Sequence, residues 1–421
     1  MSLLESYKKK KHASTFFFFF SIYFLSLRPL LIFFGLDVII PSYEFMYDFY
    51  PDIAKAHLII LVWVVLIVVF SKFSEPKNEA IRNTYKIEII NLNLLIILTT
   101  LISLMGAIFT SYFIIKFGSL SEFLYQVKIE KAMQGMYIFR EVSSWALILS
   151  GLIFLYAKLS RNYFKTTIAL GLIVINSAFI FSWGNRTTIG FFLFMLGLFY
   201  FTTFIKFKFT KVILSVVILV VVANGLRFVR EDLHSEAINH EVNSLENMGA
   251  VTALSLSMHL SEYDGLVLAS RDVGKRFDYR YGEDFANGFF AWIPRFLWPD
   301  KPQTHNTGLW FRQVYESEKR NGWPITAVGD FYVNGSWFLV IFGAILNAFL
   351  LAILNKLSHK SLIRDYLIIT FSVFVLGQGI DTGFIQTIFL KFIPVVLVVL
   401  ALKIQLSDTK HILDSAKIEQ K

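Results

Sequence analysis

The stretch FFAWIPRFLWPDKPQTHNTGLWF, residues 289–311, lies within the one long hydrophilic segment of the chain, roughly residues 231–334. Apolar runs flank this segment, and several reach the ~20 residues that an α-helix needs to cross a bilayer. Of the 421 residues, 55% are hydrophobic and 17% are charged, which is below the ~25% charged content of soluble domains. The sequence therefore predicts an all-α polytopic integral membrane protein whose water-facing chemistry lies in this segment.

Hydropathy predicts about ten transmembrane helices, seven before the hydrophilic segment and three after it. We expect them at residues 15–36, 57–70, 89–115, 144–159, 166–183, 187–205, 212–228, 335–354, 366–379 and 384–402. These positions divide the chain into a membrane domain at 1–228, a loop with short helices at 229–334, a second membrane domain at 335–402 and a tail at 403–421.

The placement of lysine and arginine predicts the orientation. Cations gather at residues 8–11, 72–86, 158–165, 206–211, 356–364 and 403–421, which all fall on one side of the predicted spans. In the opposite short loop, 37–56, most of the charged residues are acidic. By the positive-inside rule, both termini and the tail are cytoplasmic, and the large loop at 229–334 is extracytoplasmic. The same rule accounts for most of the formal net charge of +9, so we expect no nucleic-acid partner.

Metal and thiol chemistry find little support. The chain has no cysteine, its loop histidines lack the spacing of metal ligands, and Asp-x-Asp does not occur. The nearest acidic pair is Glu262-x-Asp264. We therefore expect no metal site and no cofactor.

Three arginines lie at the outer ends of predicted spans. Arg186 is in SWGNRTT, and Arg227 and Arg230 are in GLRFVRE. A guanidinium at bilayer depth is a candidate functional group, and its fork of donors fits phosphate oxygens in pairs. Such residues would suit a lipid diphosphate. The alternative is that they extend to the interface and make structural hydrogen bonds.

A second group of cations lies around the Pro-rich turn of the loop. Proline stiffens the backbone there, which fixes the positions of Arg295 and Lys301. We assign both, together with the downstream Arg312, to the same diphosphate-binding role. Trp292, Trp298, Trp310 and Trp323 either stack on sugar rings or belong to an interfacial aromatic belt.

The candidate catalytic residues are Asp330 and His305. Asp330 lies in TAVGDFYVNGSW, just before a predicted span, where a carboxylate can accept a proton from a sugar hydroxyl. The alternatives for Asp330 are a helix N-cap or a partner of a loop arginine. His305 is a weaker candidate base. Three charges expected at membrane depth, Arg28, Asp381 and Lys391, either bind a ligand or pair with one another.

Together, IPRFLWPDKP, HNTGLWF, GDFYVNG and the earlier turn GNRTT at 184–188 resemble the O-antigen polymerase family, the Wzy-type polymerases of oligosaccharide repeat units. The similar order of spans and late loop covers nearly the whole chain, whereas the sequence likeness is confined to Arg186 and about 288–336. Family members more often carry Asn-Phe-Gly after the acid, and here Val333-Asn334-Gly335 departs from that pattern.

The resemblance implies a GT-C-like, metal-independent glycosyltransferase in the bacterial cytoplasmic (inner) membrane, with its active site on the extracytoplasmic face. It implies that the growing glycan is transferred from undecaprenyl diphosphate to an incoming lipid-linked unit, in O-antigen or capsule synthesis. The implied partners are the undecaprenyl-diphosphate-linked oligosaccharide, membrane lipid, a chain-length regulator and a flippase.

Three other classes stay open. An O-antigen ligase shares the loop and the arginines but would use a histidine base, so His305 discriminates it. A flippase or other transporter predicts charged cavity residues within spans, and no inverted pair of broken helices is visible in the sequence. A structural or sensing membrane protein would make the motifs coincidental.

Overall fold

The computed structural model describes residues 12–33, 49–73, 88–128, 137–204, 261–293, 297–300, 307–315, 322–358, 361–377 and 379–406. The predicted span at 212–228 and the first part of the hydrophilic segment lie outside these residues. Within them the chain is largely helical, as the composition predicts.

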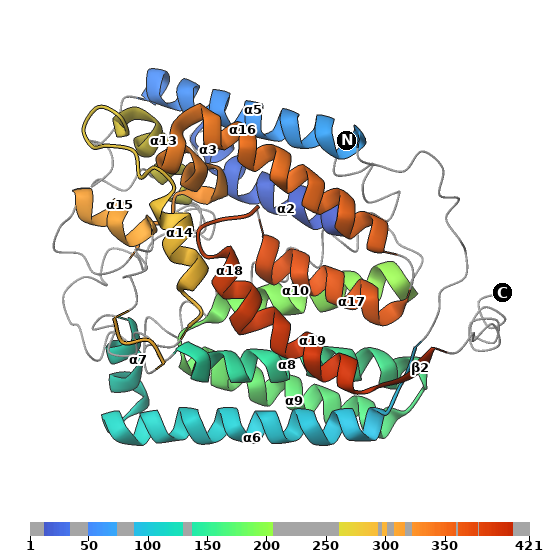
Figure 1. The fold of residues 1–421 in the computed structure, drawn as a ribbon. Coiled ribbons are helices and arrows are strands. Elements are labelled where there is room, and N and C mark those ends of the chain that lie inside the picture. Colours follow the sequence, from blue (N-terminus) through green and yellow to red (C-terminus); the bar gives the residue numbers. More distant parts are fainter. Residues whose placement is uncertain are drawn as a thin grey trace.

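The helices form a bundle in which one group of helices lies between two others (Figure 1). One side consists of α5 (Phe49–Phe73) and α16 (Thr326–Leu357). The other consists of α6 (Leu92–Phe117), α8 (Tyr137–Leu159) and α9 (Tyr163–Ser182). Between them lie α2 (His12–Leu25), α10 (Arg186–Phe204), α17 (Leu362–Phe371), α18 (Phe384–Thr387) and α19 (Ile393–Ala401). Two π-helical turns, η2 (Ser372–Leu376) and η3 (Ile388–Phe392), follow α17 and α18.

Six helices in the described part of the chain are long and apolar enough to cross a membrane: Pro51–Lys72, Leu92–Phe117, Ile138–Leu159, Tyr163–Ser182, Thr326–Leu357 and Phe384–Ala401. Each corresponds to one of the ten predicted spans. The apolar stretches Ala13–Leu25 and Thr187–Gly197 are shorter, and α17 with η2 covers 362–376, so it begins and ends earlier than the predicted span at 366–379. The chain is thus a helical, membrane-associated protein, while the count of ten and the GT-C-like architecture stay predictions.

Helix α2 connects the two sides of the bundle because its phenylalanines contribute to two different hydrophobic cores. Phe17 and Phe18 belong to one hydrophobic core, with Trp63 of α5. Phe16 and Phe20 belong to a second core, with Leu152 of α8. A helix that is apolar all round is stable when it is surrounded, which explains the run FFFFF at the centre of the bundle.

Four short helices gather at one end of the bundle, which we call the loop end (Figure 1). They are α7 (Leu120–Lys128), α13 (Ser261–Asp272), α14 (Glu283–Phe290) and α15 (Thr307–Tyr315). Helix α13 packs against α5 and α16. At the opposite end, β1 (Glu88–Ile90) pairs antiparallel with β2 (Lys403–Leu406).

A buried ion pair attaches α13 to the bundle. Arg28, which lies on α3 (Leu27–Phe33), is 3.2 Å from the carboxylate of Asp264, and both side chains are almost fully buried. Arg28 was a candidate ligand-binding charge, and the structure instead pairs it with the loop segment. Lys391 has an acidic neighbour too, since its Nζ lies 3.9 Å from Glu141.

Helix α16 begins earlier than the span predicted from residue 335, and it is broken at that point. Gly335 and Ser336 have non-helical backbone angles, and Ser336 adopts a positive φ of 55°. Such a conformation costs about 1–3 kcal/mol for a residue with a side chain, so the surroundings must enforce it. The backbone N–H of Arg280 donates to the Val333 carbonyl at 3.0 Å, and Tyr279 donates to Ser336 Oγ at 3.2 Å.

The break separates α16 into two parts with different placements. Residues 337–357 span about 31 Å as a helix, which matches a bilayer core of about 30 Å. Residues 326–334 form a separate half-helix that carries Asp330 at the loop end. The helix formed by α17 and η2 is shorter than the bilayer core, because the two together extend only about 22 Å. The resulting space at the loop end is where α14 and α15 lie.

The Arg28–Asp264 pair gives a stability prediction. Arg28→Met leaves the Asp264 carboxylate buried without its cation, so we expect the free energy of unfolding to fall by about 3–5 kcal/mol. The double variant Arg28→Met/Asp264→Leu removes both charges and should recover most of that loss. Denaturation of the three proteins in one detergent measures this, and equal stability of the single and double variants would contradict the coupling.

Candidate functional site

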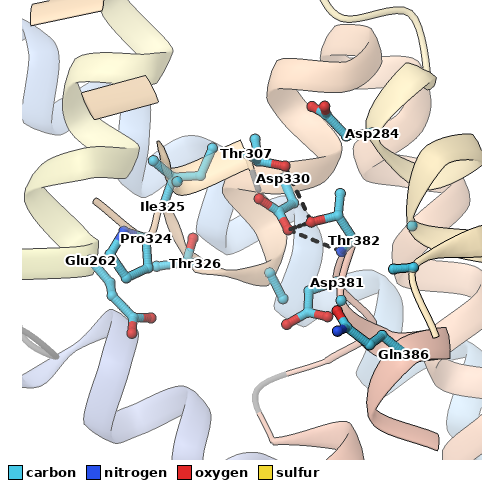
Figure 2. Close-up of a pocket in the computed structure, with 15 residues that line it drawn as sticks. Glu262, Asp284, Thr307, Pro324, Ile325, Thr326, Asp330, Asp381, Thr382 and Gln386 are labelled. Atoms are coloured by element: carbon cyan, nitrogen blue, oxygen red, sulfur yellow. Dashed lines mark hydrogen bonds between the residues drawn. The ribbon is translucent and has the colours of Figure 1, made fainter. Parts of the chain in front are cut away.

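A cavity of about 290 Å³ opens at the loop end of the bundle. It is enclosed by α13, α14, α15, the half-helix of α16 and the turn before α18 (Figure 2). These elements come from distant parts of the sequence. Loop segments and membrane helices thus build the cavity together, and its volume is near the lower end of the range for small-molecule sites, about 300 Å³.

Four carboxylates line the cavity, each from a different element. Glu262 comes from α13, Asp284 from α14, Asp330 from α16 and Asp381 from the turn before α18 (Figure 2). No lysine, arginine or histidine occurs among the described residues that line it. Burial of carboxylates is unfavourable unless they are paired or hydrogen-bonded, so the partner of each one matters.

Asp330 is held by Thr382. Its Oδ2 accepts hydrogen bonds from the Thr382 backbone N–H at 3.1 Å and from the Thr382 hydroxyl at 3.0 Å (Figure 2). The Thr382 hydroxyl also lies 3.2 Å from that of Thr307 on α15. Asp330 is only 8% exposed, and what exposure it has is toward the cavity. These bonds fix the rotamer of the carboxylate and leave Oδ1 available to a ligand.

Asp284 forms an ion pair with an arginine, whereas no ion pair to Asp330 is seen among the described residues. Arg280, four residues before Asp284 in the chain, places its Nη2 3.0 Å from Asp284 Oδ1. Asn334 Nδ2 donates to Asp284 Oδ2 at 3.3 Å and to the Asp330 carbonyl at 2.9 Å. Asn334 thus joins α14 to the half-helix. An arginine partner was one alternative for Asp330, and in the structure the arginine is bound to Asp284 instead.

Asp381 faces the cavity from a turn whose residues Gly377 and Gly379 have positive φ. The surrounding protein replaces much of its hydration, which raises the pKa of Asp381 to about 6 from its ordinary 3.8. The backbone N–H of Gly383 opposes this rise, and the negative charge of Glu262 adds to it. Near neutral pH the cavity therefore carries a carboxylate that takes up a proton easily.

Gly288 allows α14 to contact the turn. A Cβ at this position would overlap the carbonyl oxygen of Thr382. Because that atom belongs to the backbone, no side-chain rotation can relieve the overlap. The closeness of α14 to the residue that binds Asp330 therefore requires glycine.

The structure brings one predicted site residue, Asp330, into the cavity. Arg312 lies on α15 with its guanidinium 5.5 Å from the Trp323 ring, and it is not among the residues that line the cavity. Arg186 begins α10, and its side chain is not described. The remaining candidates lie outside the described residues: His305, Arg227, Arg230, Arg295 and Lys301.

The four loop tryptophans do not line the cavity either. Trp323 is buried against Phe311, and Trp310 lies 5.1 Å from the Arg280 guanidinium. Trp292, which follows α14, stacks on Phe389 of η3 with the ring centroids 4.3 Å apart, and this contact attaches the end of α14 to η3. Their observed role is packing of the loop end.

Sequence reasoning assigned no role to Thr307, although it lies within HNTGLWF, and it missed Thr382, which stands in none of the motifs. The clustering of the acids was missed as well, although Glu262 and Asp381 were each noted separately. An acid near the end of a span is visible in a sequence, but its partner 52 residues away is not. Within the described part of the chain, no group of three or more acids and histidines is placed to hold a metal ion.

The close approach at Gly288 can be tested by substitution. Gly288→Ala must push α14 away from Thr382, and overpacking of this kind costs about 1–3 kcal/mol. The matched control is Gly171→Ala on α9, where a Cβ meets nothing within 4 Å. Thermal melting in detergent should show a loss for Gly288→Ala and none for the control, and equal behaviour of the two would argue against the contact.

Asp381 should make stability depend on pH. Its folded-state pKa of about 6 is raised above the ordinary 3.8, so its ionisation destabilises the fold as pH rises from about 4 to 6, and fully above 6. Asp381→Asn removes this charge and should raise the melting temperature at pH 7.5 but much less at pH 5. Asp278→Asn, at an exposed position, is the control. A gain independent of pH would contradict the assignment.

Comparison of the chain with protein-family models, curated protein sequences and solved structures found no match in any of the three. The role of the cavity is therefore inferred from its own residues and from the sequence motifs.

Proposed function

We propose that this chain is a polymerase of undecaprenyl-diphosphate-linked oligosaccharide repeat units in surface polysaccharide synthesis, with Asp330 as its general base. The observation that carries the proposal is the Asp330 carboxylate, which is buried, clamped by Thr382 and open to a polar cavity. The motif resemblance supplies the substrate class. The lining of carboxylates and hydroxyls is consistent with it, because such groups bind the hydroxyls of a sugar.

In the proposed reaction, a hydroxyl oxygen of the incoming unit attacks the anomeric carbon of the growing glycan. The bond from that carbon to the diphosphate oxygen breaks, and undecaprenyl diphosphate leaves with the electron pair. Asp330 Oδ1 takes the hydroxyl proton. The two hydrogen bonds from Thr382 to Oδ2 keep the base oriented throughout, which is the positioning that general-base catalysis needs.

The diphosphate-binding part of the proposal rests on the sequence. Arg186, Arg227, Arg230, Arg295 and Lys301 are the candidate cations, because guanidinium and ammonium groups stabilise the charge that develops on the leaving group. Arg312 is a weaker candidate, since it lies over Trp323. The acidic lining makes the cavity itself unsuited to a diphosphate, so the proposal assigns the cavity to the acceptor sugar and the diphosphate to a neighbouring position.

Deletion of the gene and complementation test the proposal. Deletion should leave surface lipid capped with a single repeat unit, and the wild-type gene should restore long chains. Asp330→Asn should lower chain extension by about 100-fold or more, the usual contribution of a general base. Thr382→Val, which removes one of the two bonds to Oδ2, should give a smaller loss. Glycan length on gels, with protein level in the membrane measured in parallel, reports the result.

Asp278→Asn is the matched control, because it removes a carboxylate at an exposed loop position outside the cavity. Unaltered chain length after deletion would overturn the polymerase. His305→Ala addresses the ligase alternative. If it abolishes function while Asp330→Asn does not, the base is histidine and ligase-like chemistry is favoured.

A second candidate function is transport of a lipid-linked oligosaccharide. The observation that favours it is the pair of helix breaks near the cavity, at Gly335–Ser336 and around Gly377 and Gly379. Discontinuous helices with ionisable groups are typical of transporter binding sites. Deletion separates the two functions, since loss of a transporter leaves no repeat unit outside the cell, whereas loss of a polymerase leaves single units there.

A further inference from the structure

We propose that the cavity selects a sugar residue with a protonated amine, bound between Asp330 and Asp381, and rejects anionic sugars. The inference deepens the proposed function, on which it rests for the identity of the ligand as part of a glycan. It goes beyond that function because it names the charge of the acceptor sugar, which neither the motifs nor the loop cations specify.

The charge balance of the cavity is the first ground. Four carboxylates line it, and Arg280 neutralises one of them, Asp284, at 3.0 Å. The described lining residues include no cation of their own. A charge in a low-dielectric site is favourable only when it is paired, so a bound cation would relieve the arrangement. A uronic acid or phosphorylated sugar would add a further negative charge and meet repulsion from the carboxylates of Asp330 and Asp381.

The second ground is the free oxygen of Asp330. The side chain is more than nine-tenths buried, and both of its hydrogen bonds within the described chain go to Oδ2. Oδ1 therefore has no hydrogen-bond donor among the described residues, although Asp330 lines the cavity and faces it (Figure 2). A carboxylate oxygen has two lone pairs, so an ammonium group can donate to Oδ1 and supply the compensating charge while the second lone pair takes the proton of the acceptor hydroxyl.

The shape of the site favours an organic ammonium over a metal ion. No three acidic or histidine side chains of the described residues converge closely enough to hold one ion. The cavity volume of about 290 Å³ equals the share of roughly ten water molecules in the liquid, which is far more than a bare ion fills. A sugar ring fills such a space, and Thr307, Thr326 and Gln386 on the lining offer partners for its hydroxyls.

Binding of monosaccharides to the full chain in lipid nanodiscs tests the inference. The probes are glucosamine, N-acetylglucosamine, glucose and glucuronic acid at pH 7.5, measured by saturation-transfer NMR and calorimetry. We expect glucosamine to bind at least tenfold more tightly than glucose. N-acetylglucosamine should resemble glucose, because acetylation removes the charge, and glucuronic acid should not bind.

Variants locate the preference. Asp330→Asn and Asp381→Asn should each reduce the ratio of glucosamine to glucose affinity by fivefold or more. Asp278→Asn should leave the ratio unaltered. Should Asp330→Asn fail to fold, Asp381→Asn provides the same test on the opposite wall. Loss of all sugar binding in both variants would point to collapse of the site and would overturn the proposed selection.

Further outcomes separate the alternatives. Equal affinity for glucosamine and glucose, or tighter binding of glucuronic acid, overturns the inference. So does micromolar binding of Mg²⁺, Ca²⁺ or Na⁺ alone that displaces glucosamine, which would make the cavity an inorganic cation site. If gene deletion leaves chain length unchanged while the glucosamine preference and its loss in the variants stand, the proposed function fails and the inference survives. If deletion abolishes polymerisation but no amine preference exists, only the inference fails.

Discussion

Backbone groups inside a membrane protein must find hydrogen-bond partners within the protein, and this constraint explains how the broken helices at the loop end hold together. Where α16 breaks, the Arg280 N–H binds the Val333 carbonyl. In the turn before α18, the N–H groups of Ile380 and Thr382 donate to Asn347 and Asp330. At the π-helical turn η3, the Trp145 indole donates to the Leu390 carbonyl at 2.7 Å. Each break is thus bound by a side chain or a backbone group from another segment, and Asp330 is one of these partners.

Asp330 therefore has a structural role through one carboxylate oxygen and is available for chemistry through the other. One oxygen completes the hydrogen bonding of an irregular turn, and the other faces the cavity. A group with both tasks is rigid, because the turn and the half-helix fix each other. The surrounding acids act in the opposite sense, since Glu262 and Asp381 concentrate negative charge where little water remains. Functional sites commonly retain such unfavourable charge, and the rest of the fold must supply the stability that the site lacks.

The sequence predicted the helical membrane class and the approximate location of six spans, because length and apolar content suffice for that. It placed the start of three of them too late, and one of these is α8, which begins at Tyr137 rather than at 144. Helix α5 begins at Phe49 rather than at 57, and α16 begins at Thr326 rather than at 335, since both start with polar turns that lower the mean hydropathy. The break at Gly335 coincides with the predicted start. Asp330 was recognisable as an acid beside a span, but its partner Thr382 and the acids on α13 and α14 were not. They depend on tertiary packing between segments that no local pattern relates.

Helix α2 has a consequence for the order in which the protein assembles. It is made well before α16, yet it depends on that helix for a polar contact, since Asn355 Nδ2 of α16 donates to Ser14 Oγ at 2.6 Å. At roughly 5–20 residues per second, synthesis of the intervening chain takes on the order of 15–70 s. During that time the central helix has none of its final neighbours on α16 and α17. Its apolar surface keeps the helix stable in the membrane during this time, because lipid can surround the same phenylalanines that the bundle later encloses.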